Sequence, residues 1–291
     1  MGDPDQHTPP PWVLRAWERI PVAVRALMSG LFVFMVLQVG WNALVVLNLG
    51  ASPAIPWHVP AGLLYLWVVF QYFDGRWVPA STSRRRRKAL RARRLSGPEW
   101  RVALTACGAV CIFIIAFAML NYRLIDIPEE ATDLSIYPWW TVYSTLIMIS
   151  IVAGVSEEAG FRGYMQAPLE KRYGAGVAIG LTATVFWLIH LNHPGGFARG
   201  PSLLTMGLAL GALAFASRSI IPPLVTHAFA DSVVFVSAQA EIGPEWLWSP
   251  PLLSESGIDG AMAGTVFVAV VSAVVAVMAM RRLRRVTTAS T

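Results

Sequence analysis

Long apolar stretches follow one another along this chain, separated by short polar or charged segments. A helix needs about 20 apolar residues to cross a hydrocarbon core about 30 Å thick, and eight stretches approach that length. They cover residues 26–48, 58–73, 101–120, 138–158, 175–192, 201–216, 220–240 and 260–280, of which the second and sixth are short. The pattern predicts an all-α, polytopic membrane protein of about eight transmembrane helices.

Composition agrees with this class, because 55% of the residues are hydrophobic and only 14% are charged. Basic residues gather at 84–94, near both ends of the chain and on one set of loops. Acidic residues occupy the other loops. The acidic side comprises Asp126, Glu129, Glu130, Asp133, Glu241, Glu245, Glu255 and Asp259. By the positive-inside tendency both termini are expected to be cytoplasmic.

The net charge of +6 is accounted for by this topology and by attraction to the anionic headgroups of the lipid bilayer, so no nucleic-acid partner is expected. We expect a cytoplasmic segment at 1–25, one transmembrane domain at 26–280 and a basic cytoplasmic tail at 281–291. The expected location is the plasma membrane, which is the inner membrane of a prokaryote.

The candidate ionisable side chains buried inside the apolar stretches are few, and all lie between residues 157 and 231. Of the seventeen acidic residues only Glu157, Glu158 and Asp231 fall there, together with His190 and His227. A charge in hydrocarbon costs roughly 2.5 kcal/mol or more, so such residues usually face a polar cavity and mark a functional site. A polar site is therefore expected within residues 138–240.

The two adjacent glutamates are predicted to have different roles. Glu158 and Arg162 are four residues apart with the acid first, the favourable order for an ion pair on one helix face, and Pro168 can kink the helix further on. Glu157 points about 100° away and has no local cation. It is thus the carboxylate free to work in a cavity, unless both glutamates are simply solvated at a helix end.

We expect His190 and Glu157 to lie at the same depth in the membrane, on neighbouring helices. The turn signal around Gly174 makes the fourth and fifth stretches antiparallel, and each residue lies about 16 positions from it, or roughly 24 Å along its helix. Phe186 lies one turn before His190 on the same face, and His193, followed by proline, is taken as an interfacial residue.

His227 and Asp231 stand one turn apart on the seventh stretch and face the same way. A carboxylate at this spacing can hold one imidazole nitrogen and fix its tautomer. A buried pair of this kind can equally be structural, so the spacing alone leaves both interpretations open.

Together these residues resemble a known family. The patterns E-E-x-x-x-R, F-x-x-x-H and H-x-x-x-N/D, in that order on apolar helices, are similar to those of the CPBP intramembrane glutamic endopeptidases, which include the CAAX prenyl proteases and bacteriocin-processing enzymes. They lie here at Glu157-Glu158 with Arg162, at Phe186 with His190, and at His227 with Asp231, covering roughly residues 138–240.

The resemblance implies that Glu157 and His190 activate a water molecule and that the His227 motif stabilises the oxyanion. The CAAX proteases have asparagine where this chain has Asp231. An ionised aspartate cannot donate a hydrogen bond, so we assign the donor role to His227 and an orienting role to Asp231, with Glu158, Arg162 and Phe186 as structural support. The expected substrate is a membrane protein or lipidated peptide, cleaved near the cytoplasmic face.

Other classes fit less well. The H-E-x-x-H motif of zinc proteases is absent, as are the G-x-S-x-G motif of serine hydrolases and a Gly-rich phosphate loop. We therefore predict a metal-independent enzyme without a cofactor, although Glu157, His190, His227 and Asp231 are all residue types that bind metals. The alternatives are a proton-linked transporter and a non-catalytic binding or immunity protein that use the same buried groups.

Overall fold

The computed structural model describes residues 12–127, 134–193, 195–243 and 250–289, and the regular elements in these ranges are helices. The first half contains α1 (Trp12–Arg19), α2 (Val22–Ala51), α3 (His58–Phe73), α4 (Ala80–Leu90) and α5 (Gly97–Leu124). The second half contains α6 (Trp139–Glu157), the π-helix η1 (Glu158–Gln166), α7 (Ala167–Tyr173), α8 (Ala175–Leu188), α9 (Gly200–Ser217), α10 (Ile221–Gln239), α11 (Leu253–Ser256) and α12 (Gly260–Ala289). The acidic residues Glu129, Glu130, Asp133 and Glu245 lie outside the described ranges.

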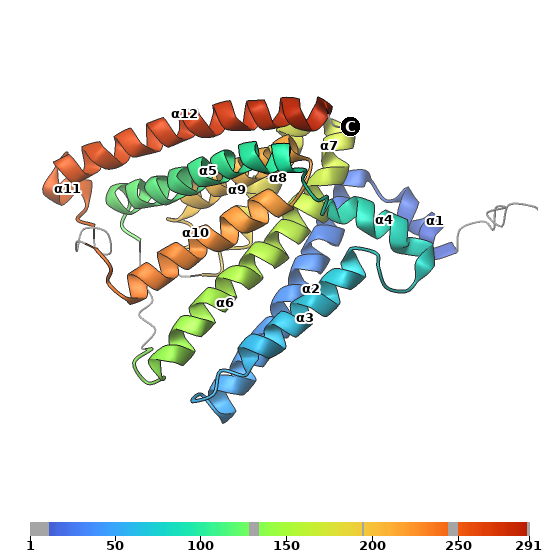
Figure 1. The fold of residues 1–291 in the computed structure, drawn as a ribbon, viewed down its shortest axis with the longest axis horizontal. Helices are drawn as coiled ribbons and strands as arrows, with labels where there is room; N and C mark the ends of the chain where they lie inside the picture. The colour runs from blue at the N-terminus through green and yellow to red at the C-terminus, as the bar shows by residue number, and fades with distance from the viewer. Residues whose placement is uncertain (1–11, 128–133, 194, 244–249, 290–291) are drawn as a thin grey trace, which may run out of the picture.

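The long helices form one bundle (Figure 1). α3 packs on α2, α2 on α6, α6 on α10, α10 on α5, and α5 on α12, while α8 and α9 pair with each other beside this row. η1 touches α2, α8 and α9, so the segment after the two glutamates lies at the junction of both groups. The prediction of an all-α fold is confirmed.

Six of these helices are long and apolar enough to cross a membrane, and α3 and α8 are shorter apolar helices. The second predicted stretch is indeed short. The sixth stretch, which corresponds to α9, was also expected to be short, and this is wrong because α9 has 18 residues. The short helix is instead α8, the fifth stretch, with only 14 residues. The chain leaves helical geometry after Leu188, ahead of the sequence Pro194-Gly195-Gly196, in which Gly195 has a φ of +67°.

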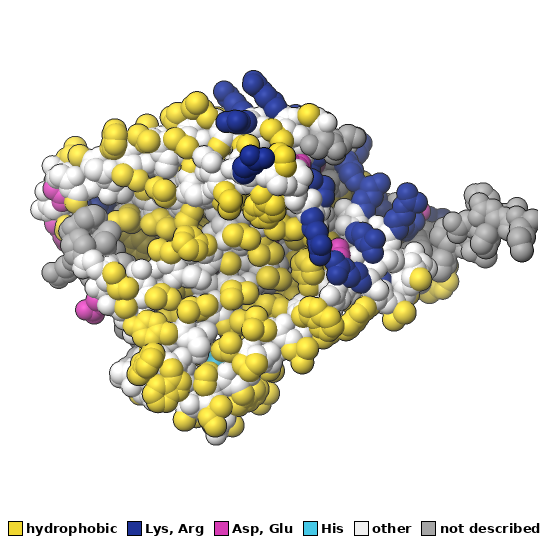
Figure 2. All heavy atoms as spheres, viewed as in Figure 1, with side chains coloured by type: hydrophobic (Ala, Val, Ile, Leu, Met, Phe, Trp, Pro, Cys, Tyr) yellow, Lys and Arg dark blue, Asp and Glu magenta, His cyan; other side chains and the backbone are white. Residues whose placement is uncertain are grey.

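Charge is separated along the bundle. Figure 2 shows hydrophobic side chains over most of the visible face, with Lys and Arg gathered at the end that carries α4, α7 and the last turns of α12. α1 and the C-terminal end of α12 both lie at this end in Figure 1. The predicted 281–291 tail begins as a continuation of α12, which remains helical to Ala289.

The helix that begins at Trp139 continues to Tyr173 but changes type on the way. The change occurs over Glu158–Gln166 in η1, ahead of the expected kink at Pro168. Pro168 comes after this change, at the second residue of α7. The predicted turn at Gly174 is present, with a φ of +84° that favours glycine.

The segment between α4 and α5 ties the basic end to the helices of the site. The carbonyl of Arg91 accepts a hydrogen bond from the Ile220 amide at 3.1 Å, and the Arg93 guanidinium donates to the Ser217 carbonyl at 2.8 Å. Arg93 also pairs with the buried carboxylate of Glu99 at 2.9 Å. The start of α10, which carries the candidate histidine, is thus held in place.

Candidate active site

The site forms where α6 and α10 approach at backbone distance. A Cβ added at Gly154 would lie 2.9 Å from both the Leu224 carbonyl oxygen and the Ala228 Cβ, so no other residue fits there without a shift of the backbone. Small residues allow such close helix packing in membranes. The contact brings Glu157, the last residue of α6, and Glu158, the first residue of η1, close to His227 of α10.

Glu158 is fully buried and is shared between two partners. Its Oε1 atom lies 2.8 Å from Arg162 Nη1 and 2.9 Å from His227 Nδ1. The ion pair predicted from the four-residue spacing is therefore present. Arg162 is further fixed by a hydrogen bond from Nη2 to the Gly207 carbonyl at 3.3 Å and by stacking 5.0 Å over the Phe186 ring. Because a carboxylate only accepts hydrogen bonds, Nδ1 of His227 is the donor.

The second nitrogen of His227 faces two other carboxylates. Nε2 lies 3.4 Å from Asp231 Oδ2 and 3.7 Å from Glu157 Oε2. Glu157 Oε2 is buried and has no hydrogen-bond partner among the described residues. An unsatisfied buried acceptor costs about 1–3 kcal/mol, and such groups in native proteins call for an explanation such as a catalytic role. Glu158 Oε2 also lacks a hydrogen-bond partner there, but Glu158 is held through Oε1 by Arg162 and His227, whereas the ion pair of Glu157 is the longer one to His227.

His190 follows the end of α8 and is half-buried. Its Nδ1 donates to the Phe186 carbonyl at 2.7 Å, which leaves Nε2 as the available ring nitrogen. The His190 ring lies 4.8 Å from that of Phe186, which in turn is 6.2 Å from that of His227. Within the part of the chain that the structure describes, no hydrogen bond joins His190 to Glu157, and the ring contacts connect His190 through Phe186 to His227.

Three features of the site were not predicted from the sequence. They are the hydrogen bond between Glu158 and His227, the π-helix, and the packing of Phe161 on Phe186 at 5.5 Å between ring centres. Gly160 was the sequence signal that could have indicated close packing here. A Cβ added at Gly160 would lie 2.8 Å from the Gly30 carbonyl oxygen of α2. A glycine inside an apolar helix often marks such a close approach.

Fold and site together define the class: a polytopic helical membrane protein with carboxylates and histidines buried between its C-terminal helices. Residues 138–233 match the family model described as type II CAAX prenyl endopeptidase Rce1-like. This match confirms the predicted resemblance to the CAAX proteases over these residues. All four candidate catalytic residues fall inside this segment. No curated protein and no solved structure matches the chain.

Metal ligation was the alternative that residue types left open. In the described ranges no group of three or more His, Cys, Asp or Glu side chains is arranged to hold a metal ion. Metal independence of the reaction stays a prediction.

The close contact at Gly154 can be tested directly. We expect Gly154→Ala to destabilise the protein by about 1–3 kcal/mol, because the added methyl group meets backbone that must move. Gly264 in α12 is the matched control, since nothing lies within 4 Å of a Cβ added there and alanine is the better helix former. Thermal unfolding of both variants in the same detergent provides the comparison. Equal effects of the two substitutions would contradict the role of Gly154.

Proposed function

We propose that the protein is an intramembrane endopeptidase that cleaves a membrane-anchored or lipid-modified protein near the cytoplasmic face. The main support is the state of Glu157 inside the segment that matches the Rce1-like family model. Its Oε2 atom is buried, has no hydrogen-bond partner among the described residues and lies 3.7 Å from Nε2 of His227. A buried carboxylate with a free acceptor is suited to take a proton from water.

In the proposed reaction Glu157, assisted by His190, accepts a proton from a water molecule, and the water oxygen bonds to the carbonyl carbon of the peptide. Negative charge develops on the carbonyl oxygen, where Nε2–H of His227 donates to it. The carbon–nitrogen bond then breaks. The leaving amine takes a proton from Glu157 or His190, so that the site returns to its starting state.

Glu158 and Asp231 contact different nitrogens of the His227 ring and are proposed to have different roles. Glu158 holds Nδ1 at 2.9 Å and is itself held by Arg162, while Asp231 lies beside Nε2 at a longer distance. In this arrangement Glu158 sets the orientation of the ring and Asp231 stabilises the charged imidazole. The orienting role given to Asp231 from the sequence thus falls largely to Glu158 in this proposal.

The proposed function can be tested before the substrate is identified. Membrane proteomes of cells with the wild-type protein and cells with Glu157→Gln should differ in the terminus of at least one membrane protein, which is cut only in the wild type. Expression of both forms at equal levels is the control. Identical termini in the two proteomes, with growth or transport altered instead, would favour a transporter or a binding protein.

Metal independence gives a separate prediction. Chelators should leave cleavage by the purified protein unchanged, because the proposed water-activating groups are a glutamate and a histidine and no zinc motif is present. Elemental analysis and an assay after dialysis against a chelator measure this. Stoichiometric zinc, with activity lost on chelation and regained on adding zinc, would replace the proposed mechanism with a metalloprotease one.

A further inference from the structure

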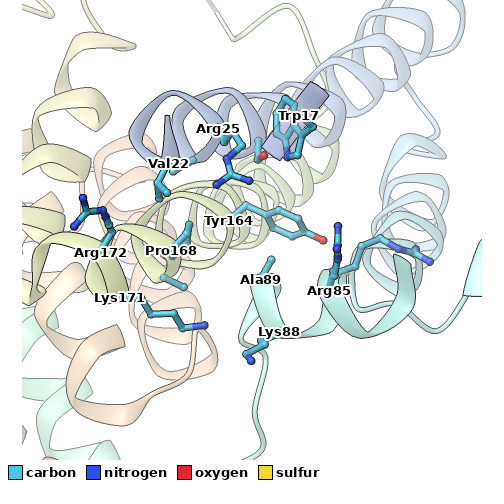
Figure 3. Close-up of a pocket in the computed structure, with 14 residues that line it drawn as sticks. Trp17, Val22, Arg25, Arg85, Lys88, Ala89, Tyr164, Pro168, Lys171 and Arg172 are labelled. Atoms are coloured by element: carbon cyan, nitrogen blue, oxygen red, sulfur yellow. The ribbon is translucent and has the colours of Figure 1, made fainter. Parts of the chain in front are cut away.

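A pocket of about 600 Å³ opens at the basic end of the bundle, between α1 and α2 on one side and α4, η1 and α7 on the other (Figure 3). None of the candidate catalytic residues lines it. It is built largely by the Arg-rich segment 84–94 and the tip of the α7–α8 hairpin, two features that the proposed proteolysis leaves without a task.

The charge of the pocket is strongly one-sided. Six cationic side chains line it and no acidic one does; the six are Arg25, Arg85, Arg86, Lys88, Lys171 and Arg172. Two nearby carboxylates lie outside the lining and are already paired, Glu170 with Arg91 at 2.9 Å and Glu18 with the lining residue Arg85 at 3.2 Å. The latter pair is exposed and contributes little. A pocket of this composition is suited to an anion.

The six cations are not equally available. Arg86 is buried and donates to the carbonyls of Tyr72, Trp77 and Pro79, so it braces the wall. Arg25, in contrast, has a buried Nε without a hydrogen-bond partner among the described residues. Lys88 and Lys171 form no ion pair within the described chain. Figure 3 shows the Arg25 guanidinium pointing into the space between α2 and α7.

Apolar side chains complete the wall and indicate where the ligand comes from. Trp17, Val22 and Pro168 line the pocket beside the cations. Tryptophan favours the level of the headgroups, and Val22 begins α2, a helix long enough to cross a membrane. Just beyond, α2 exposes Val24, Leu27 and Met28. An acyl chain can follow this exposed face while its phosphate occupies the basic pocket, a combination that a small soluble anion would not need.

We propose that this pocket binds the phosphate headgroup of an anionic phospholipid, with Arg25, Lys88 and Lys171 as its principal charged contacts. Basic pockets between transmembrane helices on the cytoplasmic side are a recognised setting for anionic headgroups. The bound lipid would bridge α2, α4 and α7 and so hold together helices that otherwise present like charges to one another.

The experiment measures lipid binding to the purified full-length protein by native mass spectrometry and by the shift of its unfolding temperature. Phosphatidylglycerol should bind and stabilise, and phosphatidylcholine of the same chain length should do neither. The triple variant Arg25→Gln, Lys88→Gln, Lys171→Gln should bind phosphatidylglycerol at least about tenfold more weakly. The matched control removes three exposed charges at the same end on α12, as Arg281→Gln, Arg282→Gln, Arg285→Gln, and should change binding less than about twofold.

A double variant and a comparison with inorganic phosphate complete the experiment. If the triple variant does not fold, Lys88→Gln with Lys171→Gln changes only exposed side chains and should still weaken binding several-fold. Equal losses in pocket and control variants would reduce the effect to general surface charge and overturn the proposal. So would stabilisation by millimolar inorganic phosphate that equals that by the lipid, because the ligand would then be a soluble phosphate.

Discussion

Glu157→Gln is expected to remove proteolysis and to leave the protein folded in the membrane. The amide has the size of the carboxylate but cannot accept the proton of the attacking water, and a positioned general base contributes about 10²–10⁴-fold to rate. Because Glu157 Oε2 has no hydrogen-bond partner among the described residues, the substitution breaks no hydrogen bond of the fold and removes only the 3.7 Å ion pair with His227. Turnover per folded protein is the measurement.

The adjacent residue is the matched control. Glu158→Gln makes the same chemical change one position later, but there it leaves Arg162 without its buried ion pair and weakens the bond to His227. Loss of one partner of a buried pair costs about 3–5 kcal/mol, so the expected effect is chiefly on expression and unfolding temperature. Full activity of well-folded Glu157→Gln protein would remove the general base from the proposal.

His227→Ala should lower turnover by at least about 10²–10³-fold, the usual loss when one oxyanion donor is removed. Two substitutions of Asp231 distinguish the effect of its negative charge from the effect of a hydrogen bond at the same position. Asp231→Ala should reduce turnover strongly, whereas Asp231→Asn should be partly tolerated because its amide can itself donate to the oxyanion. Turnover numbers are compared at equal amounts of folded protein.

His193→Ala is the control for that series, since His193 is exposed and contacts neither glutamate in the described structure. It should retain wild-type turnover. An unaffected His227→Ala enzyme would show that α10 contributes structure and not chemistry.

Local spacing predicted the parts of the site that depend on a single helix. The Glu158–Arg162 pair and the approach of Asp231 to His227 are both four-residue relations, which helical geometry alone determines. The apolar stretches likewise predicted the helices, because their length is set by the membrane and not by the neighbours of each helix.

What escaped prediction depends on packing between distant segments. Glu158 and His227 are 69 residues apart, and the packing of α6 on α10, closest at Gly154, brings them together. The π-helix arises where Gly160 meets Gly30 of α2, a partner that the local sequence does not identify. Placing Glu157 and His190 at one level assumed regular α-helix through both residues, whereas η1 begins at Glu158 and α8 stops at Leu188.

The site is not equally enclosed on all sides. The Glu158 and His227 side chains are 0% and 2% exposed, whereas that of Asp231 is 21% exposed. Asp231 is therefore the most exposed of these three side chains, and under the proposed mechanism we expect water and a peptide to approach Glu157 from its side. A peptide in a helix keeps its carbonyls in its own hydrogen bonds and so does not present one to an attacking water. Under the proposed mechanism, selection among substrates would then rest on how easily the backbone next to the membrane anchor unwinds, with side-chain identity secondary.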